Sequence, residues 1–484
     1  MWLRSDSHKN LIKELTEKNS DITARTIQCK DETVTILYIK QITNRDALAN
    51  FVIKPLIEHC QVAKHALKAA EAIESIIYAD DCTLAQDESE IEKQILSGMT
   101  VLLFSSDKEY AVVHLKKIEH RPVTDPEITY NERAPRDSFV ENLDVNLSLL
   151  RYRLKDTNLR VENIELGQRT LTNVALLYIQ DIASDTVTGE MRKRLNQIDI
   201  DGFLESGELQ AYLLNNKLSP FPQMMVIERS DMAAEALLEG KVVLLVEGSP
   251  YAISAPVTFV EFMYASDDRY ESKYVGMFMR LLRYAAFFIS FTASSYWVAV
   301  VSFHSDVLPA GFIIAIAQAR AKVPFSALLS VLLLEFIMEL IREALLRVPT
   351  KIGSAIAIVG ALIIGQAAIS AGVFSPLLLI IVSVEFLASF AIPQQTAANP
   401  FRLIKFLLML VTGMFGFYGF ILGITVIVAE MVSINSFGVP YLAPFGPFNL
   451  YDFLRTFLFS KTVSPKRQQY MRNKDDTRTD PRNR

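Results

Sequence analysis

Carboxylates inside long apolar stretches are the side chains of this sequence best placed to do chemistry. In FSALLSVLLLEFIMELIREALLRVP (325–349), Glu335, Glu339 and Glu343 recur every four residues, so one face of a helix would carry all three. The stretch also contains two cations that can pair with these carboxylates, Arg342 and Arg347. Because a lone helix in lipid would not bear this charge, the stripe must lie in a membrane interface or face protein or water.

A further carboxylate, Glu385, lies in the middle of LLLIIVSVEFLASF (377–390). A carboxylate within a membrane is a functional candidate, either as a contact for a cation or as the partner of an arginine. The alternative is a buried, protonated glutamic acid that is hydrogen-bonded to a neighbouring helix. The sequence leaves both interpretations open.

The stretch QIDIDGFLESGE (197–208) has part of the spacing of a calcium-binding loop. Asp199 and Asp201 fall at positions three and five, and Glu208 falls at position twelve. Position one is a glutamine, however, and Ser206 and the next glycine interrupt the helix that should follow. A short strand, a turn and a helix N-cap at Ser206 are the favoured interpretation.

The remaining motifs do not support catalysis or metal binding. Four possible metal ligands lack the spacing of a zinc site: His59, Cys60, His65 and Cys82. VEGSPY (246–251) resembles a nucleophile elbow, but Pro250 stands where the second glycine should be. The sequence has no P-loop, GxGxxG or HExxH motif. We therefore expect no enzymatic activity, metal site or cofactor.

The stretch IGSAIAIVGALIIGQAAIS (352–370) is uncharged and rich in small residues. As a helix it would be about 30 Å long, enough to cross a hydrocarbon core. Glycine and alanine let helices approach closely, or leave a narrow lumen where several copies meet. The polar Gln366 near one end needs a partner or water. Two interpretations remain, a closely packed bundle helix and a pore-lining helix.

Composition divides the chain into a soluble half and a membrane half. Half of the residues are apolar, and the long apolar runs fall within 284–430. The polar start has no apolar segment of a signal peptide, so we expect the soluble half to be cytoplasmic. Arg280 and Arg283, just before the first span, agree with the positive-inside rule.

The net charge of −5 favours no nucleic-acid partner. The three scattered cysteines are expected to be free thiols in a reducing compartment.

The predicted fold is an α/β soluble region of two subdomains followed by an α-helical transmembrane bundle. Strands are expected at 34–39, 100–104 and 111–115 in the first subdomain, and at 161–166, 174–179, 223–228, 242–246 and 251–257 in the second. SGMTVLLFSSDKEYAVV (97–113) and EGKVVLLVEGSPYAISA (239–255) echo one another, either through duplication or because helix-to-hairpin passages look alike. The predicted parts are a flexible lead-in (1–30), the first subdomain (31–120), the second subdomain (137–265), a juxtamembrane segment (266–283), the transmembrane domain (284–432) and a C-terminal segment with a polar tail (433–484).

Four or five membrane crossings are predicted. Spans are expected at 284–303, 352–370, 376–392 and 406–429, and 311–319 is too short to cross as a helix. The charged helix at 325–346 either crosses, giving five spans, or lies flat on the outer surface, giving four. Five is favoured. The tail past Lys461 is expected to be disordered.

Several motifs, in order, resemble the A subunit of the GerA-type spore germinant receptors of endospore-forming bacteria. They are SPFPQ (219–223) with Pro220, Phe221 and Pro222, IERSD (227–231), VEGSPYAISAPV (246–257) with Gly248 and Pro250, KVPFSALL (322–329), ELIREALLRVP (339–349) and IGQAAIS (364–370). The resemblance covers about 137–444.

The resemblance implies a subunit of a nutrient receptor in the spore inner membrane, with its N-terminal domain on the core side. It implies a permease-like B subunit that binds the nutrient, a lipoprotein C subunit, and A subunits that assemble into a ring that opens an ion path. The pore helix would match 352–370, with Leu362 and Ile363 near the constriction and Gly360, Gly365 and Gln366 beside them. The alternatives are a non-conducting scaffold and a carrier that uses the intramembrane carboxylates. The family position that matches Glu385 is usually apolar, so any role of Glu385 would be particular to this chain.

Overall fold

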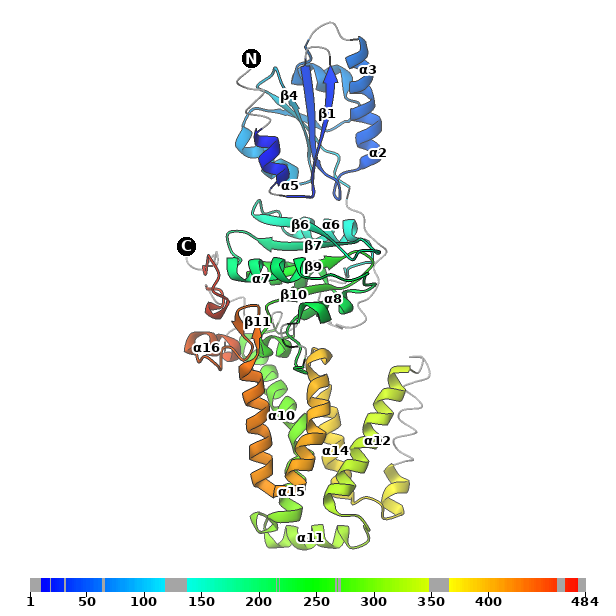
Figure 1. Cartoon of the computed structure of the whole chain (residues 1–484), viewed down its shortest axis with the longest axis vertical. Helices are drawn as coiled ribbons and strands as arrows, with labels where there is room; N and C mark the ends of the chain where they lie inside the picture. Colours follow the sequence, from blue (N-terminus) through cyan, green and yellow to red (C-terminus); the bar gives the residue numbers. More distant parts are fainter. Residues whose placement is uncertain are drawn as a thin grey trace.

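The structure, a computed structural model, describes residues 10–17, 19–29, 32–62, 66–117, 137–214, 216, 218–265, 268, 271–347, 365–458 and 466–477. Two α/β units and a helical region follow one another along the long axis of the molecule (Figure 1). The prediction of an α/β N-terminal region with two subdomains, followed by a helical part, is confirmed at this level.

The first unit is a five-stranded antiparallel sheet in the order β1-β2-β4-β5-β3. Its strands are β1 (Ile22–Cys29), β2 (Glu32–Ile39), β3 (Cys82–Ala85), β4 (Thr100–Phe104) and β5 (Tyr110–Val113). Its helices are α2 (Arg45–Ala47), η1 (Leu48–Ile53), α3 (Lys54–Val62), α4 (Ala69–Glu71), η2 (Ala72–Ile76), η3 (Glu88–Glu90) and α5 (Ile91–Leu96). Side chains alternate between the two faces of a strand, so Val34 and Ile36 enter one hydrophobic core while Leu37 and Ile39 enter the other.

The second unit repeats this topology, with the strand order β6-β7-β9-β10-β8. Its strands are β6 (Leu159–Leu166), β7 (Thr172–Ile179), β8 (Met225–Ile227), β9 (Val242–Val246) and β10 (Ala252–Ala255). Its helices are α6 (Leu143–Arg153), α7 (Asp185–Asn196), α8 (Ser206–Leu213) and α9 (Ser230–Leu238). The strands after α5 and α9 are each preceded by a glycine with positive φ, Gly98 at 89° and Gly240 at 87°. The shared strand order therefore supports duplication as the source of the echo between 97–113 and 239–255.

Five helices make up most of the helical region. They are α10 (Lys273–Phe303), α11 (Ala310–Arg320), α12 (Ala327–Arg347), α14 (Pro376–Ser389) and α15 (Gln395–Ser433). By length and composition, two stretches of helix among the described residues are long and apolar enough to cross a membrane, Tyr274–Phe303 and Gln395–Ser433. The short α11, which covers the predicted non-crossing piece, lies across the lower ends of the other helices (Figure 1).

The helix α15 reverses direction at Gly416. That residue has φ 60° and ψ −140°, which is not helical. A Cβ on Gly423 would lie 2.5 Å from Leu408, fifteen residues earlier, which a straight helix would not allow. The predicted single span at 406–429 is therefore wrong, because α15 is a hairpin of two antiparallel helices (Figure 1).

Part of the N-terminal segment forms a strand. The predicted flexible lead-in (1–30) is wrong for Ile22–Cys29, because all eight residues of β1 pair with β2. The middle of β1 is exposed and polar, as suits an edge strand, and this weakens its hydrophobic signal.

The expectation of three free thiols is also wrong. Cys29 and Cys60 form a disulfide between β1 and α3, and Cys82 is free.

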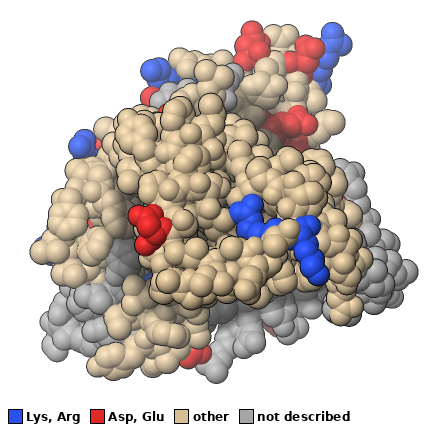
Figure 2. Space-filling model, turned by 90° about the horizontal axis from the view of Figure 1, so that it is seen from below, with Lys and Arg blue, Asp and Glu red and all other residues tan. Residues whose placement is uncertain are grey.

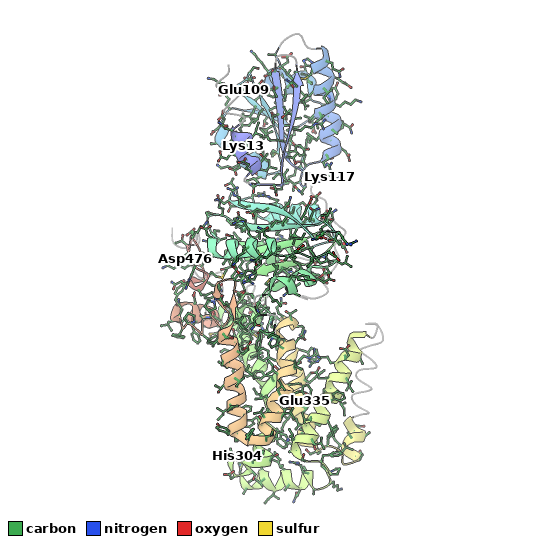
Figure 3. The ribbon with its side chains drawn as sticks, viewed as in Figure 1. Lys13, Glu109, Lys117, His304, Glu335 and Asp476 are labelled. Atoms are coloured by element: carbon green, nitrogen blue, oxygen red, sulfur yellow. A yellow bond between two sulfur atoms is a disulfide. The ribbon has the colours of Figure 1, made fainter. Side chains whose placement is uncertain are left out.

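Elements after α15 return to the second unit. They are β11 (Asn435–Ser436), β12 (Val439–Pro440), α16 (Leu450–Leu458) and η8 (Gln469–Met471). Asn473 Nδ2 donates to Glu239 O at 2.8 Å, and Lys474 N donates to Ile182 O at 2.9 Å. The predicted disordered tail is therefore wrong for 466–477, and Asp476 lies beside the second unit (Figure 3).

The C-terminal segment (466–477) and the α/β units lie at the same end of the helical region (Figure 1). If the helices cross a membrane, five crossings would put these parts at opposite ends, so this arrangement disagrees with the preference for five. Arg280 and Arg283, near the start of α10, are bound by other parts of the chain. Arg280 is buried and donates to Thr456 O at 2.9 Å, whereas Arg283 pairs with Asp268 at 3.0 Å.

Candidate functional site

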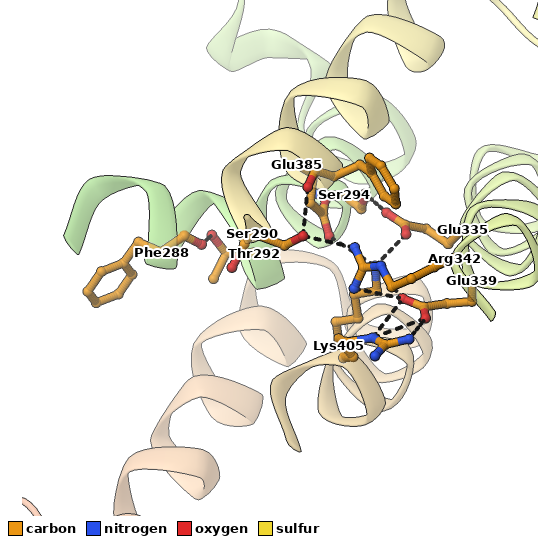
Figure 4. A network of polar contacts seen from close by, with 12 residues as sticks. Phe288, Ser290, Thr292, Ser294, Glu335, Glu339, Arg342, Glu385 and Lys405 are labelled. Atoms are coloured by element: carbon orange, nitrogen blue, oxygen red, sulfur yellow. Dashed lines mark hydrogen bonds and ion pairs between the residues drawn. The ribbon is translucent and has the colours of Figure 1, made fainter. Parts of the chain in front are cut away.

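Charged side chains from α12, α14 and α15 meet hydroxyls inside the helical region (Figures 3 and 4). Glu335 of α12 is 2% exposed and Glu385 of α14 is 1% exposed. Both carboxylates point toward Ser294 of α10 and Lys405 of α15 (Figure 4). Each helix is apolar on most of its surface, so packing brings these few polar positions together.

Lys405 is the cation at the centre of this cluster. Its Nζ lies 2.5 Å from Glu335 Oε2, 3.7 Å from Glu385 Oε1 and 3.8 Å from Glu339 Oε1. Removing two charges from water costs several kcal/mol per ion, so a buried ammonium requires close carboxylates. Lys405 therefore holds α15 against both α12 and α14.

Ser294 joins the two buried carboxylates from the side of α10. Its backbone N–H donates to Glu385 Oε2 at 2.8 Å. Its Oγ lies 2.5 Å from the same oxygen and 2.6 Å from Glu335 Oε1. One hydroxyl thus contacts carboxyl groups from two other helices.

The outer part of the cluster consists of ion pairs that are less buried. Glu339 accepts hydrogen bonds from Nε and Nη2 of Arg402 in a bidentate pair. Arg342 lies 3.7 Å from Glu339, donates to Ser389 Oγ at 2.8 Å and stacks 4.7 Å from the centre of the Phe386 ring. The part of the charged stripe formed by Glu335 and Glu339 therefore faces protein, which is one of the arrangements the sequence allows.

The cluster does not include every charged residue that the sequence singles out. Glu343 lies further along α12 and is exposed. Arg347 is the last residue of α12, and its side chain lies outside the described part. Gly360, Leu362 and Ile363 also fall outside the described residues. Gly365 and Gln366 open a short helical stretch over 365–370, and Gln366 is exposed.

The SPFPQ motif lies where the second unit meets the helices. Phe221 is buried, and its ring centroid is 5.3 Å from that of Phe401 on α15. Phe401 in turn lies 4.7 Å from Phe287 on α10. Pro222 beside it is partly buried and Pro220 is exposed. Phe259, which follows β10, lies 5.1 Å from Phe287, so aromatic contacts join the second unit to both long helices.

The VEGSPY motif forms the turn between β9 and β10. Gly248 has φ 85°, a conformation that favours glycine, and its N–H donates to Glu141 O at 2.7 Å. Pro250 follows, partly buried, in the same turn. The residues of this motif thus shape a turn and form no catalytic arrangement.

The stretch 197–208 has the turn and helix start that the sequence favours, but the predicted short strand and the N-cap at Ser206 are wrong. Asp199 accepts a hydrogen bond from Gln168 at 2.7 Å. Glu205, one residue before the predicted Ser206, caps α8 by accepting from Gly207 N at 2.8 Å. Within the described residues, His, Cys, Asp and Glu side chains form no group of three that could hold a metal ion.

Ser294 and Lys405 were not identified as site residues from the sequence. Ser294 is one of several hydroxyls in α10, and Lys405 lies outside the apolar runs of the sequence. Lys405 lies directly before the predicted span at 406–429, where a lysine can reach a membrane interface, so the pattern carried no signal that Lys405 is buried.

Fold and site define a two-part protein, in which paired α/β units are joined by aromatic residues to helices with a charged interior. Residues 10–470 match the family described as Bacillus/Clostridium GerA spore germination protein. The chain is 34% identical to "Spore germination protein KA" of Bacillus subtilis (strain 168) over 91% of this chain and 82% of that protein. It is 33% identical to "Uncharacterized membrane protein YfkQ" of the same organism over 85% and 80% of the two chains.

A solved structure is also similar, that of the N-terminal domain of the A subunit of the Bacillus megaterium spore germinant receptor GerK3. It is 28% identical, with a TM-score of 0.40, over 51% of this chain and 92% of that one. The chain belongs to the GerA spore germination protein family. It is an A-type germinant receptor subunit.

Proposed function

We propose that this subunit assembles with copies of itself in the spore inner membrane and forms an ion path that nutrients open. The α/β units would lie on the core side. A permease-like B subunit would bind the nutrient, and a lipoprotein C subunit would complete the receptor. The segment 352–370 would line the path, since it is uncharged and rich in small residues.

The distribution of charge in the helical region carries the proposal of a membrane location. Glu335, Glu385 and Lys405 are buried, whereas large apolar side chains are exposed on the same helices. Examples on α15 are Leu403, Leu407, Met414, Tyr418 and Ile421. Few charged side chains appear on the face seen from below (Figure 2). Apolar side chains outside and charges inside suit hydrocarbon rather than water.

The aromatic junction supplies a route for coupling the two parts. Phe221 contacts Phe401 of α15, and Phe259, which follows β10, contacts Phe287 of α10, so the second unit touches both long helices. A nutrient bound to a partner can open the path only if it favours the open state over the closed state. Movement of the second unit against these rings would transmit that preference to the helices.

Substitutions of the leucine and the isoleucine at the proposed constriction test whether the chain conducts ions. In liposomes that contain the receptor, Leu362→Ala or Ile363→Ala should cause ion leak without nutrient, because a wider hydrophobic constriction wets more easily. Leu407→Ala, which shortens an exposed leucine on α15, is the matched control and should leave the resting flux unchanged. An unchanged resting flux in both constriction variants would favour a non-conducting scaffold.

The buried carboxylates favour a carrier as the second candidate. A carrier would use Glu335 or Glu385 as its coupling site. It would take up substrate without partner subunits, with a rate that changes with pH. Uptake by the chain alone that Glu385→Gln abolishes would therefore replace the channel proposal.

A further inference from the structure

We propose that Glu335, Ser294 and Glu385 together hold one proton, which the two carboxyl groups share through the serine hydroxyl. This proposal goes beyond the ion path, and it stands whether or not the chain conducts ions. Two observations carry it, the hydrogen-bond geometry and the charge of the fully buried part of the cluster.

The geometry requires a hydrogen that Ser294 cannot supply by itself. Ser294 Oγ lies 2.6 Å from Glu335 Oε1 and 2.5 Å from Glu385 Oε2. A hydroxyl carries one hydrogen, which can make a short, near-linear bond to only one acceptor, and an ionised carboxylate only accepts. The second close oxygen contact therefore needs its own hydrogen, and a carboxylic acid provides it.

The burial of the charged side chains also indicates one bound proton. The side chains of Glu335, Glu385 and Lys405 are 2%, 1% and 6% exposed. Two ionised carboxylates and one ammonium would leave a net charge of −1 enclosed among apolar helices, which is costly. One proton makes this enclosed group neutral. Oε1 of Glu385 also has no hydrogen-bond partner among the described residues, and its nearest cation, Lys405, is 3.7 Å away.

The other charges around the cluster lie on its more exposed side, where two arginines face one glutamate and leave a surplus of one positive charge. α12 contributes Glu339 and Arg342, and α15 contributes Arg402. The side chains of these three residues are 20%, 12% and 27% exposed. From α10 the cluster receives the backbone N–H and hydroxyl of Ser294. All six groups together would be neutral if ionised. The shared proton therefore concerns only the three most buried groups, and the surplus positive charge stays on the more exposed side, at Arg342 and Arg402.

The proton has a direct route between its two positions. In one state the Glu385 carboxyl donates to Ser294 Oγ, and the Ser294 hydroxyl donates to Glu335, which is ionised and paired with Lys405. When the O–H bond of Glu385 breaks, its proton passes to Ser294 Oγ and the serine hydrogen passes to Glu335 Oε1. Ser294 still has one hydrogen, and Glu385 becomes the ionised partner of Lys405. The two states bind Lys405 to different helices, α12 in the first and α14 in the second.

Infrared difference spectroscopy of the purified full chain in liposomes at neutral pH tests this proposal. The wild type should show a carboxylic acid C=O band that shifts in deuterium oxide. Glu385→Gln and Glu335→Gln should each lose the band, because either change leaves one carboxylate for Lys405 and no need for a proton. Glu339→Gln is the matched control on the same helix and should keep it.

Two outcomes would overturn the shared proton: absence of the band from the wild type, and survival of the band in either glutamine variant. If a glutamine variant does not fold, Ser294→Ala provides a second measurement. Loss of the hydroxyl bond should shift the C=O band to higher frequency, and an unchanged band in Ser294→Ala would contradict the bridge. The infrared measurement does not depend on ion flux, so failure of this test is distinct from failure of the conduction proposal.

Discussion

Lys405 is the side chain on which the buried charges of the helical region converge. Its ammonium pairs with Glu335 and lies within 4 Å of Glu339 and Glu385. Lys405→Met would leave these carboxylates without their central cation, at a cost of roughly 3–5 kcal/mol for a broken buried pair. We expect a marked loss of thermal stability in detergent.

Lys322→Met is the control for this prediction, because Lys322 is exposed in the same region. It should leave the unfolding temperature nearly unchanged. Adding Glu335→Gln to Lys405→Met should recover part of the lost stability, since it removes one of the uncompensated charges. Equal unfolding temperatures for Lys405→Met and wild type would show that the pair is not enclosed.

Asp137 makes the stability of the second unit depend on pH. Burial alone raises the pKa of Asp137, but hydrogen bonds from Arg153 and Ser230 together outweigh it and hold that pKa below its usual value. A carboxyl with a lower pKa in the folded state contributes stability above its unfolded pKa. That contribution is lost as the pH falls through the folded pKa.

Asp137→Asn should therefore lower the free energy of unfolding at neutral pH and have less effect at acid pH. Denaturant unfolding of the full chain across the acid range measures this difference. Asp201→Asn is the control, because the Asp201 side chain is 82% exposed. A loss for Asp137→Asn that stays constant with pH would contradict the linkage.

At the scale of elements, the turn inside α15 depends on one glycine. Gly416 has φ 60° and ψ −140°, and a Cβ there would lie 3.0 Å from the ring of Phe303. Gly416→Ala should therefore cost about 1–3 kcal/mol through backbone strain and lower the unfolding temperature. Gly311→Ala is the matched change on α11, where the added methyl group meets no atom within 4 Å, and should be neutral or stabilising. An equal effect of the two substitutions would contradict the hairpin.

Hydrophobic pattern predicted most strands of the α/β units. β4 and β9 are short, fully buried runs next to turn residues, and their predicted bounds agree with the structure. The strands that were missed, β1 and β3, are edge strands with mostly exposed or half-buried residues, so their sequences carry little apolar signal. The turn at Gly416 was missed because it lies in an apolar run with no polar residue to mark it.

The carboxylates of the candidate site could be predicted from the sequence, but their partners could not. Glu335, Glu339 and Glu385 stand out because a carboxylate in an apolar run needs an explanation. Their partners come from helices far apart in the sequence, and periodicity does not identify which helices pack together. Ser294 and Lys405 therefore became site residues only through the tertiary structure.

At the scale of the whole molecule, the C-terminal segment joins the helices back to the second unit. Lys474 N donates to Ile182 O, at the place where Lys117 N donates to Ile42 O in the first unit. Arg467 adds a hydrogen bond to Leu238 O at 2.9 Å. A peptide from the end of the chain thus supplies to the second unit what the segment after β5 (114–117) supplies to the first. The helical region is therefore tied to the second unit on both of its flanks, by α10 and by this segment.

This closure fixes which parts of the molecule share a side of the membrane. α10 leads away from the second unit to α11, and the last half of α15 returns to it (Figure 1). If the helices span a membrane, the α/β units and the C-terminal segment lie on one side and α11 lies on the other. An even number of crossings follows, because an odd number would separate the C-terminal segment from the unit on which it packs.

Single cysteines labelled with a membrane-impermeant maleimide test this arrangement, in a chain whose native cysteines are replaced by serine. Lys108→Cys in the first unit and Thr477→Cys in the C-terminal segment are exposed positions and should react from the same side. Gln318→Cys on α11 is also exposed and should react only from the opposite side. Vesicles of the two orientations provide the two sides, and detergent gives the total for each cysteine. Reaction of Thr477→Cys together with Gln318→Cys would contradict the arrangement, because 466–477 cannot pack on the second unit from across a bilayer.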